Sequence, residues 1–366
     1  MQITAAVSME RDPHGELVLQ ELELEAPRAD EIMVRLVATG VCGSDLHGRG
    51  SFHPRPIVLG HEGAGVVVEV GSSVTKVEVG DHVLLNYIAC GKCPTCVSGM
   101  PKLCPHNAVL NHSGARADGS TGLSRDGQVV YGQFFGQSSF ATHCLANEQQ
   151  ATVLDPSLDL TLAPAFACGV QTGAGTVANG LRPKVGDSIV VIGAGAVGMS
   201  AIMMAHLLGC ATIIAVDVAP QRLALASELG ATHTVDSRET DNLAEAVRAI
   251  VPGGVQFAID AAGRTDLTET AVACLAKGGF CAVLGLDMGG GSFSLPHYQF
   301  AMTGVGVGGF PGGLVVPDEF VPRLTTLHAQ GRFPVDKLVQ TFDFADIGAA
   351  VTAAESGAAI KPVLVF

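Results

Sequence analysis

Four cysteines close together in the chain have the spacing of a metal site. The pattern Cys-x2-Cys-x2-Cys-x7-Cys spans 15 residues and brings together Cys90, Cys93, Cys96 and Cys104. Loops this short hold four sulfurs close enough for tetrahedral coordination, and a closed shell of four thiolates leaves no position for water or substrate. The spacing therefore predicts a structural zinc that stabilises a glycine- and proline-containing lobe with little core of its own. An iron–sulfur cluster and unliganded thiols are the alternatives.

A second set of ligand-type residues lies on stretches that read as loops between short strands. Cys42 stands in Gly-Val-Cys-Gly-Ser-Asp-Leu-His, and His61 and Glu62 follow Gly60. A thiolate, an imidazole and a carboxylate can bind zinc and leave one position open for chemistry. Each of these residues alone is typical of a buried side chain, so a site requires a third ligand from elsewhere. Cys168, at the entry to a helix-forming segment, is the candidate.

A glycine turn is the third chemical feature of the chain. The β-branched run 189–192 ends in Gly-Ala-Gly-Ala-Val-Gly and passes directly into an apolar helical segment. A strand, a tight turn and a helix start in this order present backbone N–H groups and the positive helix end to a dinucleotide pyrophosphate. The residues expected at the cofactor are Gly193, Gly195, Val197 and Gly198.

An acidic residue supports the dinucleotide reading and indicates which dinucleotide binds. Asp217 ends a second strand-like run, 212–217, and lies 19 residues after Gly198. That offset is typical of a carboxylate that binds the adenosine ribose. Because a carboxylate repels a 2′-phosphate, NAD is favoured over NADP. Arg222 argues against this preference, since an arginine near the ribose can accommodate the 2′-phosphate of NADP.

The segments before Cys168 that would position these groups read as strands joined by turns. The runs 31–37 and 65–71 are strand-like, and the region from residue 1 to about residue 85 is expected to be all-β. A polar, glycine-rich stretch at 109–133 predicts a long loop. Strand-like sequence resumes at 134–141. Three phenylalanines there are expected in the core: Phe134, Phe135 and Phe140.

After Cys168 the chain alternates between strand-like and helical segments. This alternation predicts an α/β fold with a doubly wound parallel sheet. The expected segments are helix 220–229, strand 233–235, helix 242–250, strand 256–260, helix 267–276 and strand 279–284. From about residue 304 the pattern no longer repeats.

Length and composition agree with this division and exclude several classes of function. A chain of 366 residues exceeds the usual size of one domain. Its net charge of −14, without a basic run, argues against nucleic acid or an anionic membrane as partner. The N-terminus has no signal-peptide core, and the most apolar helical run, 196–208, is too short to span a bilayer. The expected location is cytoplasmic, where ten cysteines are thiols or metal ligands.

Taken together, the motifs resemble those of the zinc-dependent medium-chain alcohol dehydrogenases along essentially the whole chain. The resemblance is carried by Cys42 with Ser44, Asp45 and His47, by Gly-His61-Glu62, by the four-cysteine lobe, by Cys168-Gly-Val-Gln-Thr172, by the 193–198 turn with Asp217, and by Lys361-Pro-Val-Leu-Val-Phe. Within the family, the stretches 134–141 and 168–175 are most similar to aryl (benzyl-type) alcohol dehydrogenases.

The resemblance implies two Zn²⁺ ions per chain, NAD, and a role for each site residue. The catalytic zinc would be held by Cys42, His61 and Cys168. It would act as a Lewis acid on the alcohol, whose hydride passes to the nicotinamide. The other implied roles are proton transfer by Ser44 and His47, orientation of His61 by Asp45, transient metal binding by Glu62, nicotinamide contact by Thr172 and pyrophosphate binding by Lys361.

The resemblance also implies the domain organisation and the class of substrate. A mainly β, GroES-like catalytic domain would comprise 1–169 and 306–366, a Rossmann coenzyme domain would comprise 170–305, and the active site would lie between them in a homodimer or homotetramer. The substrate would be an aryl, allylic or other bulky primary alcohol, and terpenoid and medium aliphatic alcohols stay open, because the pocket lining depends on the loops around Phe52, Tyr87 and Leu110.

Two alternatives remain at the sequence level. Polyol and secondary-alcohol dehydrogenases share Cys-Gly-Ser-Asp-x-His, although their third zinc ligand is commonly a glutamate. A non-catalytic NAD-binding protein on this scaffold would be expected to have lost ligands or relay residues, and none of them is lost here.

Overall fold

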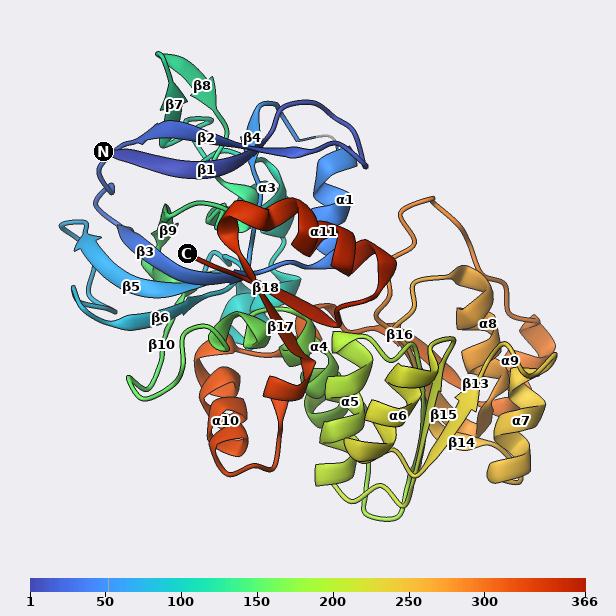
Figure 1. The fold of residues 1–366 in the computed structure, drawn as a ribbon. Helices are drawn as coiled ribbons and strands as arrows, with labels where there is room; N and C mark the ends of the chain where they lie inside the picture. The colour runs from blue at the N-terminus through green and yellow to red at the C-terminus, as the bar shows by residue number, and fades with distance from the viewer. Residues whose placement is uncertain (52) are drawn as a thin grey trace. The chain divides into compact units, whose positions relative to one another are not determined.

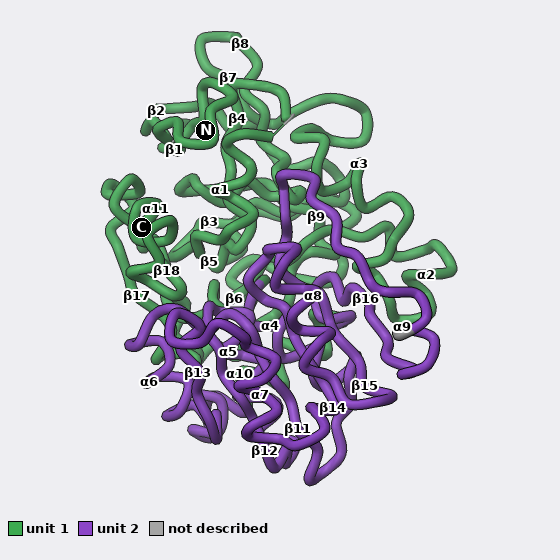
Figure 2. The backbone as a smooth tube through the Cα atoms, turned by 90° about the vertical axis from the view of Figure 1, so that its right-hand side faces the viewer, with its two compact units in different colours: residues 1–168, 316–326, 335–366 green, residues 169–315, 327–334 purple. Residues whose placement is uncertain are grey.

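The computed structural model describes residues 1–51 and 53–366, so Phe52 lies outside the described residues. Contacts within the chain group it into two compact units, drawn in different colours in Figure 2. Unit 1 consists of residues 1–168, 316–326 and 335–366, and unit 2 of residues 169–315 and 327–334. Within residues 1–51 and 53–366, no helix has the length and apolar character needed to cross a membrane.

Unit 1 is built on two sheets (Figure 1). The five-stranded sheet has the order β4-β1-β2-β7-β8. Its strands are β1 (Gln2–Ser8), β2 (Leu17–Leu24), β4 (Ile57–Val58), β7 (Leu123–Arg125) and β8 (Gln128–Val130). The seven-stranded sheet has the order β10-β6-β5-β3-β18-β17, with β9 also paired to β3. Its strands are β3 (Glu31–Gly40), β5 (Gly63–Val70), β6 (His82–Leu85), β9 (His143–Asn147), β10 (Ala151–Val153), β17 (Val339–Asp343) and β18 (Lys361–Val365).

Short helices connect these strands, and the longer ones follow the return of the chain to unit 1. The α-helices are α1 (Gly43–Gly50), α2 (Pro94–Val97), α3 (Asn107–His112), α10 (Pro317–Ala329), which runs across the unit boundary, and α11 (Ile347–Ser356). The 3-10 helices are η1 (Pro101–Leu103), η2 (Phe134–Gly136), η3 (Glu148–Gln150), η4 (Ala163–Phe166), η7 (Val335–Leu338) and η8 (Phe344–Asp346).

The prediction of one long loop at 109–133 is only partly right, because regular structure interrupts this stretch at both a helix end and a hairpin. It contains the end of α3 and the antiparallel hairpin β7–β8. The hairpin turns at Asp126 and Gly127, whose φ angles are +51° and +74°. An Asp-Gly pair that can adopt positive φ is a strong hairpin signal.

The strand predicted at 134–141 is wrong, although its aromatic residues are core residues as expected. Phe134, Phe135 and Phe140 are buried, but the segment turns through η2. The Ser138 hydroxyl accepts a hydrogen bond from the Phe134 N–H at 2.9 Å and donates one to the Val58 carbonyl at 2.6 Å. These tertiary bonds hold a turn where aromatic content alone favours a strand.

Unit 2 confirms the predicted doubly wound parallel sheet. The strand order is β13-β12-β11-β14-β15-β16, every pair is parallel, and the order is that of a dinucleotide-binding sheet. The strands are β11 (Ser188–Ile192), β12 (Thr212–Asp217), β13 (His233–Asp236), β14 (Val255–Asp260), β15 (Leu275–Val283) and β16 (Gly306–Gly309). The helices are α4 (Gly169–Gly175), the π-helix η5 (Thr176–Leu181), α5 (Ala196–Leu207), α6 (Pro220–Glu228), α7 (Leu243–Ile250), α8 (Thr265–Ala273), α9 (His297–Thr303) and the 3-10 helix η6 (Pro311–Leu314).

The central strands of this sheet are buried because their β-branched residues pack on both faces. All five residues of β11 are buried, and one core cluster joins β11, β12 and β14 to α7 and α8. Helix α7 begins where the Asn242 side chain accepts the Glu245 N–H at 3.2 Å, a typical N-cap. The sheet therefore presents a rigid strand end at Ile192, where the glycine turn begins.

Candidate functional site

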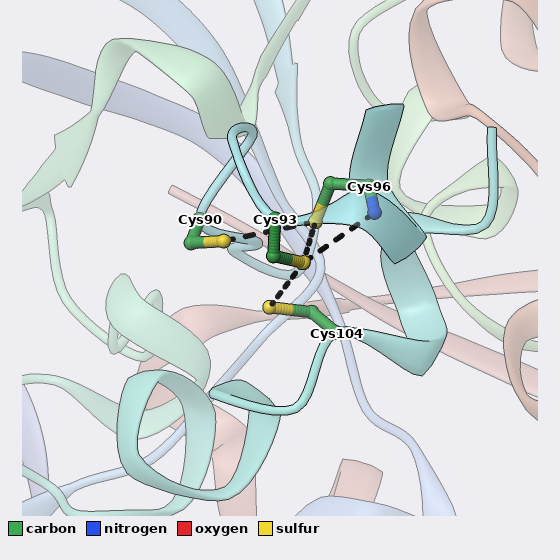
Figure 3. A group of neighbouring side chains, drawn as sticks. All are labelled: Cys90, Cys93, Cys96 and Cys104. Atoms are coloured by element: carbon green, nitrogen blue, oxygen red, sulfur yellow. Dashed lines mark hydrogen bonds between the residues drawn. The ribbon is translucent and has the colours of Figure 1, made fainter. Parts of the chain in front are cut away.

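The four cysteines of the lobe lie at the corners of a compact cluster (Figure 3). The sulfur–sulfur distances are 3.4 Å for Cys93–Cys96, 3.9 Å for Cys90–Cys96 and 3.9 Å for Cys93–Cys104. Four sulfurs around one zinc at about 2.3 Å would be roughly 3.8 Å apart. All four cysteines are free of disulfides, so the cluster matches a tetrahedral thiolate site.

Backbone N–H groups prepare this lobe for an anionic sulfur. The Cys96 N–H donates to the Cys93 sulfur at 3.5 Å, which places Cys93 at the N-cap of α2. Hydrogen bonds from the backbone of Lys92 and Cys93 lower the pKa of the Cys90 thiol to about 6. At neutral pH Cys90 is therefore largely a thiolate, which is the form that binds a metal.

The second candidate metal centre forms where two neighbouring strands of the seven-stranded sheet meet. Cys42 follows the end of β3 and His61 precedes the start of β5, and these strand ends pair through Thr39 and Gly63. Cys168 follows η4, which contacts β3, β5 and β18. The Cys42 and Cys168 sulfurs are 3.9 Å apart, and one donor atom from each of Cys42, His61, Glu62 and Cys168 lies within 4.8 Å of the others.

One nitrogen in this cluster has no partner among the described residues. The Nε2 atom of His61 is buried and makes no hydrogen bond, whereas Nδ1 is bonded to Asp45. A buried polar atom without a partner is unfavourable unless a ligand satisfies it. An imidazole nitrogen beside two cysteine sulfurs is a donor set that zinc prefers, so these residues fit a zinc ion.

Asp45 joins the two loops that carry the candidate ligands. Its carboxylate accepts the Cys42 N–H at 2.9 Å and the Gly60 N–H at 3.1 Å, and it lies 2.8 Å from His61 Nδ1. Burial lowers the pKa of His61, but the Asp45 carboxylate raises it to about 10. The contact expected between Asp45 and His61 is therefore present, and it directs Nε2 toward the cysteines.

Glu62 and Lys361 form an ion pair in the interior of unit 1. The Lys361 Nζ donates to both carboxylate oxygens at 2.7 and 2.6 Å, and the two residues are 0% and 2% exposed. Gly40 makes the pair possible, because a Cβ there would lie 1.9 Å from a Glu62 oxygen. The pyrophosphate role predicted for Lys361 is not supported by this placement, since its ammonium is buried and bonded to Glu62.

The other predicted catalytic residues, Ser44 and His47, lie on α1. Ser44 is half-buried and His47 is exposed. Among the described residues, 1–51 and 53–366, the side chains of Ser44 and His47 make no hydrogen bond. Proton transfer through these two residues therefore stays a prediction.

The glycine turn of unit 2 has the geometry expected of a pyrophosphate site. Gly193 has a φ of +97°, and a Cβ at Gly198 would lie 1.8 Å from the Gly193 carbonyl oxygen. A Cβ at Gly195 would meet no protein atom within 4 Å. The first and third glycines therefore allow the turn and the close helix, while the second leaves open space beside the N-terminus of α5, whose first residues include Val197.

Asp217 lies beside this turn at the end of β12. Its oxygens accept the Ala194 N–H at 2.7 Å and the Ala219 N–H at 2.9 Å, and Arg222 Nη1 is 3.9 Å away. Thr172 lies on α4, which packs so closely on α5 that a Cβ at Gly173 would be 1.9 Å from the Val197 carbonyl oxygen. Unit 2 thus brings together the turn, the acid and Arg222.

The sequence reasoning missed Lys102, whose ammonium lies over the rings of Tyr87 and Phe135. Phe135 in turn stacks on His61, with ring centroids 4.5 Å apart. The only available signal was the position of Lys102, two residues before the predicted ligand Cys104.

Two protein-family models match the chain. The zinc-binding dehydrogenase model matches residues 196–327, and the alcohol dehydrogenase GroES-like domain model matches residues 28–156. They correspond to the parallel-sheet and mainly β parts of the fold, and they confirm the fold class predicted from the sequence.

Relatives with assigned activities extend over the whole chain. Geraniol dehydrogenase of Castellaniella defragrans is 37% identical over 366 residues, which make up 100% of this chain and 98% of the relative. Alcohol dehydrogenase 6 of Rattus norvegicus is 30% identical over 97% of this chain and 96% of its own length.

Solved structures match equally well. Benzyl alcohol dehydrogenase from Acinetobacter calcoaceticus superposes with a TM-score of 0.95 at 37% identity, covering 100% of this chain and 99% of its own. An alcohol dehydrogenase zinc-binding domain protein from Burkholderia ambifaria gives 0.97 at 41% identity with the same coverage. These matches confirm the resemblance drawn from the motifs: the chain belongs to the zinc-dependent medium-chain alcohol dehydrogenases and is an oxidoreductase that acts on alcohols.

Proposed function

We propose that this dehydrogenase oxidises bulky primary alcohols, of the aryl or allylic type, to aldehydes with NAD as the hydride acceptor, and that each chain holds two zinc ions. The observation that carries the proposal is the convergence of Cys42, Cys168 and the unpartnered His61 Nε2 in unit 1. The substrate class follows from similarity to a geraniol dehydrogenase and to a benzyl alcohol dehydrogenase.

Each zinc ion has a distinct role in this proposal. The zinc held by Cys42, His61 and Cys168 supplies a Lewis acid that makes the alcohol hydroxyl more acidic. The zinc held by Cys90, Cys93, Cys96 and Cys104 leaves no position for substrate and stabilises the lobe.

The residues around the first centre prepare it for this chemistry. The contact between Asp45 and Nδ1 fixes the His61 ring so that Nε2 is the nitrogen that would bind the zinc. Lys361 occupies both oxygens of Glu62, which keeps this neighbouring carboxylate bonded inside the unit. Ser44 and His47 are the groups we assign to carry the alcohol proton to solvent, because a hydride acceptor cannot take it.

Unit 2 supplies the groups assigned to the dinucleotide. We assign the pyrophosphate to the N–H groups of the Gly193 to Gly198 turn and the N-terminus of α5, and the adenosine ribose to Asp217. Thr172 is assigned to the nicotinamide. Lys361 is left out of this set because its ammonium is buried against Glu62.

The proposed function predicts the outcome of an alcohol screen. Purified protein should reduce NAD with benzyl alcohol and geraniol, and elemental analysis of the same sample should give two zinc ions per chain. Turnover restricted to polyols or to secondary alcohols would replace the proposal with the alternative class of the same family. No turnover of any alcohol by zinc-replete protein would refute it.

The cofactor assignment predicts a preference for NAD over NADP of at least about tenfold in kcat/KM, which requires about 1.4 kcal/mol of discrimination. Asp217→Asn should narrow this gap, because it removes the charge but keeps an oxygen for the Ala194 and Ala219 N–H groups. The matched control is Asp187→Asn. Asp187 lies just before β11, at the end of that strand away from the glycine turn, so this variant should leave the ratio of NAD to NADP kcat/KM values unchanged. Equal use of both cofactors by the unmodified enzyme would mean that Arg222 overrides the carboxylate.

A further inference from the structure

A lysine side chain rests on two aromatic rings beside the Cys42, His61 and Cys168 cluster. The Nζ of Lys102 is 4.1 Å from the ring centroid of Tyr87 and 5.3 Å from that of Phe135, within the range of cation–π attraction. The backbone that carries Lys102 is fixed in η1, where its carbonyl accepts Asn107 Nδ2 at 3.0 Å. The ammonium is therefore held in one place by its rings and its backbone.

One of these rings also contacts a candidate zinc ligand. Phe135 is 8% exposed and stacks on His61 at 4.5 Å. Its φ of +50° lies in the left-handed region, which is a strained conformation for a bulky side chain. Backbone strain of this kind is concentrated at functional sites. Phe135 thus links the ammonium of Lys102 to the place where the alcohol would react.

The charge of Lys102 is not balanced by a carboxylate. Across residues 1–51 and 53–366, no carboxylate oxygen lies within 4 Å of its Nζ, and the Nζ donates no hydrogen bond. Burial lowers the pKa of Lys102, and the nearby sulfurs of Cys168 and Cys42 oppose this lowering. A zinc ion held by these sulfurs would offset their charge, which would leave the Lys102 ammonium on its two rings without a counter-ion among the described residues.

Two histidines complete this group without adding charge. The His53 ring is 5.2 Å from that of Phe134, and the His112 ring is 4.9 Å from that of Phe135. Burial lowers the pKa of His53, and burial followed by the charge of Lys102 lowers the pKa of His112 to about 4. Both histidines are therefore neutral at pH 7, and Lys102 is the cation whose ammonium lies on the Tyr87 and Phe135 rings.

From this arrangement we infer that Lys102 is a specificity-determining residue that favours aryl alcohols carrying an anionic oxygen on the ring, of which a ring carboxylate is the simplest case. The inference rests on the proposed function and names its substrate class more narrowly. An ammonium held on aromatic faces with unused N–H donors gains a charge-assisted hydrogen bond from such a substituent, whereas a neutral aryl alcohol offers it nothing.

The test compares two substrates of similar shape, para-(hydroxymethyl)benzoate and para-methylbenzyl alcohol. In the unmodified enzyme the ratio of their kcat/KM values should favour the carboxylate. Lys102→Met should lower that ratio at least about tenfold, and Lys102→Arg should retain most of it, since a charge-assisted hydrogen bond is lost in the first variant and kept in the second. Lys277→Met removes an exposed lysine from unit 2 and should leave the ratio unchanged.

A binding measurement separates this inference from the proposed function. Calorimetric titration of zinc-loaded protein with para-(hydroxymethyl)benzoate, without nucleotide, should show a dissociation constant at least about tenfold higher for Lys102→Met than for the unmodified protein. Zinc content is measured on each variant, because Lys102 lies two residues before the candidate zinc ligand Cys104. If Lys102→Met loses zinc, Lys102→Gln takes its place in the comparison. An unchanged dissociation constant or an unchanged substrate ratio overturns the inference. Failure of para-methylbenzyl alcohol as a substrate instead overturns the proposed function.

Discussion

Cys168→Ala is expected to lower alcohol oxidation at least about a thousandfold and to leave the fold intact. A Lewis-acid metal contributes several kcal/mol to lowering the barrier, and the variant removes one of the three strong ligands that would hold it. Cys168 lies in a connection after η4 and takes no part in a strand pair, so the sheets do not depend on its sulfur. Turnover, zinc content and far-ultraviolet circular dichroism on the same sample test all three expectations.

The matched variant is Cys93→Ser, which removes a ligand from the other centre. Hydrophobic side chains of that lobe are exposed, with Val97 at 75%, Met100 at 39% and Leu103 at 44%, so its own packing contributes little. Metal binding in such a segment contributes directly to the folding free energy. Cys93→Ser should therefore lower the melting temperature and open the lobe to proteolysis. Active unmodified protein with one zinc or none would contradict the two-centre assignment.

The grouping of the candidate metal ligands could be predicted because their signal is local or belongs to known motifs. Cys90, Cys93 and Cys96 are so close in sequence that any compact loop brings them together, and the structure places the Cys96 sulfur 3.9 Å from that of Cys90 and 3.4 Å from that of Cys93. The turn at Gly193 and the parallel sheet that presents it were predictable for the same reason, since strand, turn and helix follow each other directly.

What could not be read from local patterns are the contacts that depend on distant strand pairing. Cys42 and His61 meet because β3 pairs with β5, a register that leaves no mark in the sequence around either residue. The partner of Glu62 is 299 residues away on β18, which pairs with β3 and returns the chain to the same sheet. The pyrophosphate role of Lys361 came from the family resemblance alone, and nothing in the sequence around Lys361 indicates that its ammonium is buried against Glu62.

Lys361→Met is expected to lower the free energy of unfolding by about 3–5 kcal/mol, because it leaves the Glu62 carboxylate buried without a partner. Burial lowers the pKa of Lys361, but the Glu62 carboxylate raises it above its ordinary value. Because the folded-state pKa of Lys361 is raised, the ion pair contributes its full stabilisation at any pH below the unfolded-state lysine pKa of about 10.4. This stabilisation is lost only as the pH rises through the folded-state pKa. Urea unfolding at pH 7, followed by circular dichroism, therefore measures the full effect.

Two further variants show whether the loss comes from the unpaired charge. Lys76→Met breaks a pair of the same length, 2.7 Å to Asp318, between side chains that are 29% and 47% exposed. It should change stability by less than about 1 kcal/mol, since exposed ion pairs contribute little. Glu62→Gln combined with Lys361→Met removes both charges and should recover much of the loss, because the penalty arises from the lone carboxylate and not from the missing attraction. If Lys361→Met unfolds at the same urea concentration as the unmodified protein, the pair is reached by water, and the placement of Lys361 inside unit 1 is wrong.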